Sequence, residues 1–126
     1  MDVQRVDFVS FLTHDIARAK AFDSETLGLE IEGESANNME FRVGQVTLDI
    51  FNPASIGRPF AANLGGMAIR VPDVAAARAE LEAKGVEFHG ETLDTGVCHM
   101  ASFHHPDGNL LLLHRRYAPF SDGRLP

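Results

Sequence analysis

The amino-acid sequence predicts an α+β fold made of two tandem βαβββ modules. Segment 8–21 aligns with segment 66–79, and each reads as an alternating strand, an Asp and an alanine-rich helix. A glycine follows each predicted helix, at Gly28 and Gly85, where the left-handed conformation that ends many helices favours glycine. The segments after these glycines alternate between apolar and polar residues, which is the period of a strand with one covered face.

The first module is expected to extend over about residues 4–52. Asp15 should cap its helix, because the carboxylate can accept hydrogen bonds from the free amides of the first turn. Gly44-Gln45 is typical of a tight hairpin turn. The strands expected after the helix cover residues 30–33, 39–43 and 46–51.

The second module repeats this plan over about residues 65–117, with Asp73 as the helix cap. His105-Pro106-Asp107-Gly108 has strong turn chemistry and predicts a second hairpin. The strands expected here cover residues 86–89, 97–103 and 109–115. Residues 53–64 are richer in Pro, Gly and Asn and are interpreted as the connector, and residues 118–126 as a C-terminal tail.

Composition limits the classes of partner. The chain has 126 residues, 44% of them hydrophobic and 23% charged, which is ordinary for one globular domain. A formal charge of −7 argues against a nucleic-acid partner, because binding phosphates requires a basic surface. No segment approaches the roughly 20 apolar residues that span a bilayer, no signal peptide is visible, and there is one cysteine. We therefore expect a cytoplasmic protein with no membrane partner.

Two motifs resemble a known family. Segment 15–29 resembles the first-module signature of the vicinal-oxygen-chelate superfamily, which includes glyoxalases, bleomycin-resistance proteins and extradiol dioxygenases. Segment 103–110 resembles the strand–turn–strand signature of the same superfamily, and the resemblance covers about residues 4–117. Two positions depart from the pattern: Asp23 stands where an aromatic residue is common, and His105 stands where an Asp commonly precedes the proline.

The resemblance implies that a helix covers one side of each sheet, while the other side belongs to a curved mixed sheet around a cavity. It also implies pairing as a homodimer. Strand alternation then sorts the side chains between the two sides. The first module offers a polar wall and the second a mostly apolar one, a mixture that suits small organic ligands. The candidate ligand-binding residues are Phe8, Ser10, Leu12, Arg42, Asp49, Phe51, Arg70, Met100, Ser102, Leu112 and His114.

Relatives usually hold a divalent metal at four positions on these strands, and the resemblance places those positions at Phe8, Asp49, Gly66 and Leu112. Only Asp49 has a side-chain donor for a cation, and one carboxylate cannot complete a tetrahedral or octahedral site. We therefore expect no cofactor and no metal at the usual place, with a divalent metal elsewhere as the alternative.

That alternative is a displaced site made of Asp49, His104 and His114, since two imidazoles and a carboxylate are the ligand set of many iron(II) oxygenases. Against it, His104 lies next to the turn, and the two histidines are several residues apart along the hairpin. The other interpretation is that His104 is a rim residue and His114 caps the exposed end of its strand.

Asp49 and Glu40 are also the candidate catalytic residues. They are expected to lie directly opposite each other across the first hairpin, where two like charges raise the pKa of one group. Arg42, diagonal to Asp49, is expected to neutralise this pair. The functional interpretation is a carboxylate base with Arg42 or Arg70 binding an anionic group. The other interpretation is a solvated polar wall with ordinary ion pairs.

The leading functional hypothesis is a metal-independent protein that binds a small organic molecule in a cavity between the modules, like the antibiotic-sequestering members of the superfamily. The alternative is an enzyme, namely a lyase, isomerase, thiol transferase or dioxygenase, that uses a displaced metal or the carboxylate pair. A third hypothesis is a dimeric accessory module without a ligand. The sequence does not identify the ligand, and fold membership alone does not establish a reaction.

Overall fold

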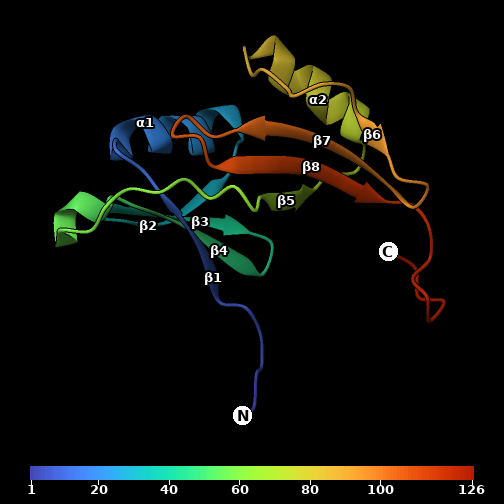
Figure 1. Cartoon of the computed structure of the whole chain (residues 1–126), viewed down its shortest axis with the longest axis horizontal. Helices are drawn as coiled ribbons and strands as arrows, with labels where there is room; N and C mark the ends of the chain where they lie inside the picture. The colour runs from blue at the N-terminus through green and yellow to red at the C-terminus, as the bar shows by residue number, and fades with distance from the viewer. The chain divides into compact units, whose positions relative to one another are not determined.

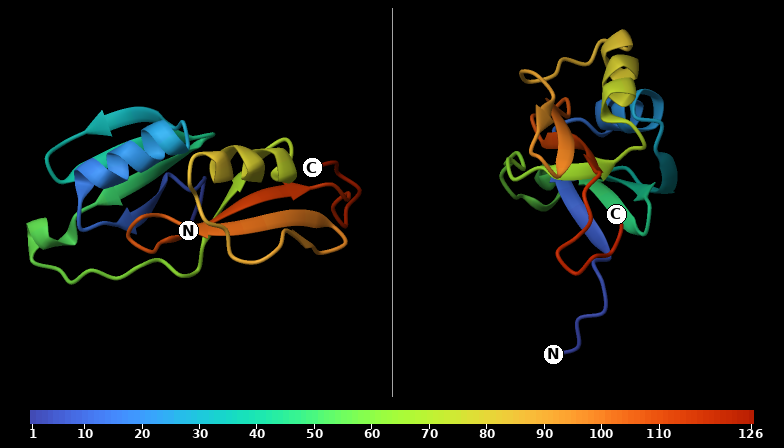
Figure 2. Two further views of the ribbon diagram at one scale, coloured as in Figure 1. Left: turned by 90° about the horizontal axis from the view of Figure 1, so that it is seen from above. Right: turned by 90° about the vertical axis from the view of Figure 1, so that its right-hand side faces the viewer.

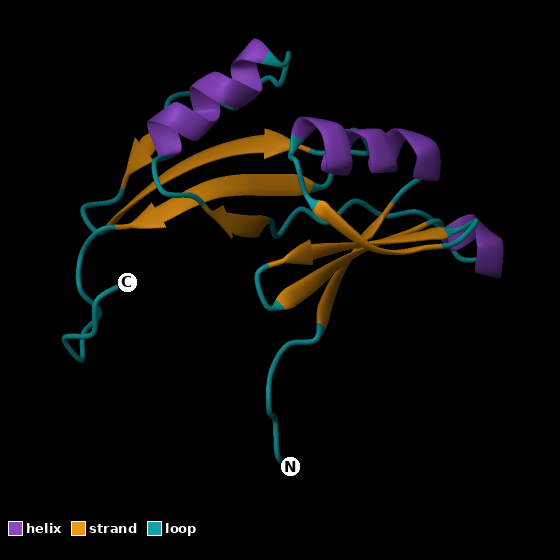
Figure 3. Ribbon diagram, turned by 180° about the vertical axis from the view of Figure 1, so that it is seen from behind, coloured by secondary structure: helices purple, strands orange, loops and turns teal.

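The computed structural model describes all 126 residues of the chain. Residue contacts divide it into two compact units. Unit 1 comprises residues 1–64 and 105–109, and unit 2 comprises residues 65–104 and 110–126. Residues 1–7 and 117–126 contain no helix or strand (Figure 3). None of the chain's helices combines the length and apolar character that a membrane crossing needs.

Unit 1 contains a four-stranded mixed sheet in the order β1-β4-β3-β2 (Figure 1). Strand β1 is parallel to β4, and the other neighbours are antiparallel. The strands are β1 (Phe8–Leu12), β2 (Glu30–Glu34), β3 (Asn38–Val43) and β4 (Val46–Phe51). Met39, Phe41, Leu48 and Ile50 are fully buried, and alternation along β3 and β4 puts them together on the covered side of the hairpin.

The helix of unit 1 has two parts, α1 (Ile16–Ala21) and a π-helical turn, η1 (Phe22–Thr26). Asp15 caps α1 by accepting a hydrogen bond from the Arg18 amide at 3.0 Å, as predicted. In η1 the Leu27 amide donates to the Phe22 carbonyl at 3.0 Å, which is the wider π-helical spacing. This turn carries Asp23 into the interior, where its side chain is fully buried.

Unit 2 repeats the plan, with its sheet in the order β5-β8-β7-β6. The strands are β5 (Met67–Arg70), β6 (Leu93–Asp94), β7 (Cys98–His104) and β8 (Leu110–Arg116). Helix α2 (Val74–Ala83) contacts β7 and β8 and lies across them (Figure 2). Asp73 caps α2 by accepting from the Ala76 amide at 3.0 Å. The two tandem βαβββ modules predicted from the repeat are confirmed.

The predicted strand at residues 86–89 is wrong. Its only backbone pairing with the sheet is an isolated bridge between Phe88 and Phe103, and the short strand β6 at Leu93–Asp94 pairs with β7 instead. Phe88 packs against Phe103 with ring centroids 5.1 Å apart, so its apolar character reflects core packing. Gly90, at φ +66°, then turns the chain before β6 begins, a conformation that favours glycine.

The turn between β7 and β8, residues 105–109, is built into unit 1. Asn109 Nδ2 donates to the Leu12 carbonyl at 2.9 Å, and Asn109 Oδ1 accepts from the Asn63 amide at 2.8 Å. Asp107 accepts hydrogen bonds from the Thr13 hydroxyl and from the His14 amide. Unit 1 is therefore completed by a segment that follows most of unit 2 in the sequence.

Candidate functional site

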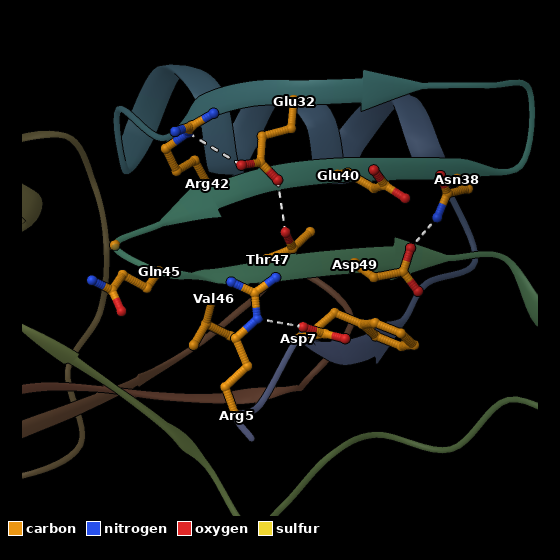
Figure 4. Close-up of a pocket in the computed structure, with 12 residues that line it drawn as sticks. Arg5, Asp7, Glu32, Asn38, Glu40, Arg42, Gln45, Val46, Thr47 and Asp49 are labelled. Carbon is orange, nitrogen blue, oxygen red and sulfur yellow. Dashed lines mark hydrogen bonds and ion pairs between the residues drawn. The ribbon is translucent and has the colours of Figure 1, made fainter. Parts of the chain in front are cut away.

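The open face of the unit 1 sheet lies on the side opposite helix α1 (Figure 4). Polar and charged side chains from β2, β3, β4 and the segment before β1 project from it. They surround a hollow of about 680 Å³. Its lining residues are Arg5, Asp7, Phe8, Glu32, Asn38, Glu40, Arg42, Gly44, Gln45, Val46, Thr47 and Asp49.

Asp49 is held in place by two side-chain donors. The Ser10 hydroxyl, its register neighbour on β1, donates to Asp49 Oδ2 at 2.9 Å. Asn38 Nδ2 donates to the other oxygen, Oδ1. Each carboxylate oxygen of Asp49 therefore accepts a hydrogen bond from a strand that flanks β4. These two bonds fix the orientation of the carboxylate before a ligand binds.

Glu40 lies opposite Asp49 in the register of β3 and β4, as predicted. Its carboxylate leans the other way, over Gly33 on β2, where an added Cβ would be 2.9 Å from Glu40 Oε2. This direction separates the two like charges, which would repel if both side chains pointed inward. The Glu40 side chain has no hydrogen-bond or ion-pair partner within the chain, so this carboxylate in the hollow is free to accept hydrogen bonds.

Arg42 does not neutralise the Glu40–Asp49 pair, and that expectation is wrong. Its Nε atom lies 3.1 Å from Glu32 Oε1 and 3.7 Å from Glu30 Oε2. Glu30 is the register neighbour of Arg42 across β2 and β3, so the arginine finds its partners on that side. One end of the hollow therefore has paired charges, and the other has the Asp49 and Glu40 carboxylates without a cation.

The hollow brings together part of the predicted ligand-binding set. Phe8, Arg42 and Asp49 line it directly, and Ser10 contributes by holding Asp49. Leu12 and Phe51 are register neighbours at the far end of β1 and β4 and are outside the lining.

Several lining residues were missing from the predicted site. Alternation along β3 puts Asn38 on the same face as Glu40, but only the structure shows that it reaches Asp49. Glu32 reaches the hollow beside a register shift between Ile31 and Gly33, an irregularity that alternation does not reveal. Arg5 and Asp7 pair at 2.7 Å ahead of β1, in a segment without any strand signal.

Five of the predicted residues lie on the open face of unit 2, in two rows that are separated by one row of covered-face residues. Arg70, His114 and Met100 form one row across β5, β8 and β7. Leu112 and Ser102 are register neighbours in the next row but one along the same face. The period-two assignment of these five residues to one side agrees with the observed pairing.

Comparison with known proteins decides the family. The sequence profile of the Glyoxalase/Bleomycin resistance protein/Dioxygenase superfamily matches residues 5–113. The chain belongs to this superfamily. The comparison with curated protein sequences gave no significant match.

Solved structures share the glyoxalase-superfamily fold of the chain at low sequence identity. A glyoxalase/bleomycin resistance protein/dioxygenase from Nocardioides is 16% identical, with a TM-score of 0.80 over 100% of this chain and 92% of that one. A lactoylglutathione lyase from Agrobacterium tumefaciens is 17% identical, with a TM-score of 0.78 over 90% of this chain and 95% of that one. TnmS3, an antibiotic binding protein from Streptomyces sp. CB03234, is 24% identical, with a TM-score of 0.78 over 92% of this chain and 98% of that one.

The residues of this superfamily member do not fit the usual divalent metal. In unit 2, Gly66 has φ +84°, and an added Cβ there would be 2.6 Å from Leu112 Cδ1. The leucine methyl therefore fills the side-chain space beside Gly66, at the two places where the resemblance puts metal donors. In unit 1, Phe8 accompanies Asp49 in the lining of the hollow, and a phenyl ring has no lone pair for a cation.

The two histidines of the displaced metal site lie far apart along the unit 2 sheet of this glyoxalase-superfamily chain. His104 lies opposite Leu110, whereas His114 lies opposite Met100. The histidines are thus four positions apart along β7, or about 13 Å at the usual strand rise. A metal ion needs each imidazole nitrogen at about 2.1 Å. His104 instead places its Nδ1 atom 2.5 Å from Nε2 of His89.

The two positions at which the chain departs from the superfamily pattern contact each other inside unit 1. His105 Nε2 lies 2.9 Å from Asp23 Oδ2, and both side chains are fully buried. Burial raises the pKa of the Asp23 carboxyl above its ordinary value, an effect that the hydrogen bond and charge of His105 only partly offset. Phe22 and Phe11 pack edge-on around the His105 ring. This pair therefore belongs to the core and not to the open face.

Proposed function

We propose that this glyoxalase-superfamily chain binds a small organic molecule on the open face of unit 1, without the divalent metal that its relatives usually hold. The observation that carries the proposal is the pair of carboxylates in the hollow. Asp49 is oriented by Ser10 and Asn38, while Glu40 beside it has no partner in the chain.

The lining favours a ligand with hydrogen-bond donors, such as an amine or a hydroxylated ring. Carboxylates only accept hydrogen bonds when ionised, and a charged donor strengthens each bond. Phe8 adds an apolar surface, since its side chain lines the hollow and remains 61% exposed. A volume of about 680 Å³ is in the range of small-molecule pockets.

The lack of suitable donors at Phe8, Gly66 and Leu112 supports the metal-free part of the proposal, because binding would then rest on side-chain contacts alone. Relatives with the same fold include one described as a lyase and one described as an antibiotic binding protein. We propose the second kind of role for this chain.

The proposal is tested by thermal-shift screening of the full chain in EDTA against a library of small amines and polyols, followed by calorimetric titration of the strongest hit. A ligand that binds the native state raises the melting temperature by mass action. Glu40→Gln and Asp49→Asn should each weaken its binding about tenfold, since hydrogen bonds to charged groups contribute roughly 1.5–3 kcal/mol.

Glu87→Gln is the matched control, because it makes the same chemical change at an exposed residue outside the hollow. It should leave the affinity unaltered. The proposal fails if the strongest hit binds both site variants as tightly as the original chain, or if it binds only when a divalent metal replaces EDTA.

A further inference from the structure

Unit 2 contains a hollow lined by cationic side chains, although the chain as a whole is negatively charged. The formal net charge is −7, yet the side chains around this hollow of about 440 Å³ include no carboxylate. It lies where β5 and β8 meet the C-terminal segment. Its lining residues are Arg70, His114, Arg116, Phe120, Leu125 and Pro126.

Arg70 is an arginine whose side chain has no partner within the chain; Arg58 and Arg115 are also unpartnered, but they lie outside this hollow. Arg70 is the register neighbour of His114 across β5 and β8, so both side chains leave the same face of the sheet. Elsewhere in the chain, Arg5 and Arg124 each pair with an Asp at 2.7 and 2.6 Å. The Arg70 side chain has no hydrogen bond or ion pair, and its five donors are available to a ligand.

Arg116 organises the other side of the hollow. Its Nε atom donates to the Ala118 carbonyl at 2.8 Å and its Nη2 atom to the Pro119 carbonyl at 2.9 Å. Its guanidinium carbon also lies 4.4 Å from the centre of the Phe120 ring. These contacts hold the segment after β8 against the sheet, and they leave the positive charge of Arg116 uncompensated by any carboxylate.

Phe120 and Leu125 give the hollow an apolar side. Phe120 is 39% exposed and Leu125 is 81% exposed, although both line the same space as the cations. Such a combination matches a ligand that carries a negative charge on an apolar body. A guanidinium binds a planar carboxylate through two parallel hydrogen bonds, and the imidazole of His114 can donate another.

We propose that this hollow is a carboxylate site that takes an aryl or alkyl carboxylate. Arg70 binds the carboxylate, His114 donates to it, and Phe120 and Leu125 cover the apolar body. The site consists of unit 2 residues only, so it does not depend on the ligand proposed for unit 1.

Calorimetric titration of the full chain with benzoate, inorganic phosphate and benzyl alcohol tests the proposal. Benzoate should bind more tightly than phosphate, and benzyl alcohol, which has the ring without the charge, should not bind. Arg70→Gln should weaken benzoate binding about tenfold or more, and Arg70→Lys should recover part of the loss because it keeps the charge but not the paired donors.

Arg115→Gln is the matched control. It removes the same charge one residue from His114, but Arg115 faces the other side of β8 and lines a different hollow. Its benzoate affinity should equal that of the original chain. The proposal is overturned if Arg115→Gln weakens binding as much as Arg70→Gln, if Arg70→Gln has no effect, or if phosphate binds as tightly as benzoate.

Discussion

The Asp107 side chain joins the β7–β8 turn to the segment between β1 and α1 and to α1 itself. Asp107 is a turn residue with a fully buried side chain. It accepts hydrogen bonds from the Thr13 hydroxyl, the His14 amide at 3.0 Å and Arg18 Nη2 at 2.8 Å. Burial raises the pKa of its carboxyl, but these donors and the Arg18 charge outweigh burial and hold that pKa below its ordinary value.

This lowered pKa makes the free energy of unfolding depend on pH, because folding then favours the ionised Asp107 carboxylate. Since the folded carboxyl has the lower pKa, the stabilisation is complete above the ordinary Asp value of about 3.9 and is lost as the pH falls through the folded value. Asp107→Asn should lower the free energy of unfolding at neutral pH by about 2 kcal/mol. Urea denaturation at neutral pH and near pH 3 measures this.

The difference in free energy of unfolding between Asp107→Asn and the original chain should be smaller near pH 3 than at neutral pH. Asp2→Asn removes the same charge from the exposed N-terminal segment and should change neither value. A constant difference at both pH values would show that the Asp107 carboxylate charge has no part in the stabilisation.

The sequence predicts the positions of some side chains in the candidate site and not the partners of others. Alternation and the hairpin turn correctly place Asp49 and Glu40 opposite each other, because a strand has a fixed period of two. The partners of Arg42 could not be predicted. A long, flexible side chain can reach several carboxylates, and the register shift in β2 that decides the choice has no sequence signal.

At the scale of elements, the buried Asp23–His105 pair ties η1 to the β7–β8 turn. Asp23 Oδ1 and His105 Nδ1 have no hydrogen-bond partner, so the pair is only partly satisfied. Removing one member leaves the other buried alone, which is strongly unfavourable. Replacing both members by apolar residues removes that penalty.

Asp23→Leu and His105→Leu should therefore each lower the free energy of unfolding by about 3 kcal/mol. The double variant should lose less than either single variant. Chemical denaturation of the four proteins gives the coupling energy directly. Losses that simply add in the double variant would mean that the two side chains act independently.

The same scale shows why one predicted strand failed. Residues 86–89 alternate between apolar and polar side chains as a strand does. Phe88, however, packs on Phe103 and beneath Arg78, whose guanidinium carbon is 4.9 Å from the ring centre. Alternation over only four residues does not distinguish a paired strand from a packed loop. The helix caps were predictable because Asp15 and Asp73 act locally, within three residues.

At the scale of the whole molecule, the repeat was sufficient to predict the fold class and both βαβββ modules. The repeat could not show that residues 105–109 belong to unit 1, since contacts that join distant segments leave no periodic pattern. Homodimer formation, which the resemblance implies, stays a prediction.

The metal-free hypothesis also concerns the whole molecule. Elemental analysis of the purified chain should find nickel, zinc, manganese and iron well below one equivalent, because Phe8, Gly66 and Leu112 provide no donor atoms. Restoring one donor with Leu112→Glu should not be sufficient for stoichiometric binding. One equivalent of any of these metals in the original chain would contradict the hypothesis.

The turn at residues 105–109 has a consequence for synthesis on the ribosome. His105 follows its partner Asp23 by 82 positions, and Asn109 follows Leu12 by 97. Residues 1–64 emerge before residues 105–109, so the last buried contacts of unit 1 wait until that turn has been translated. A nascent fragment that stops before His105 would leave the Asp23 carboxyl and the Leu12 carbonyl without their partners. Unit 1 should therefore complete its folding late, although most of its residues are synthesised first.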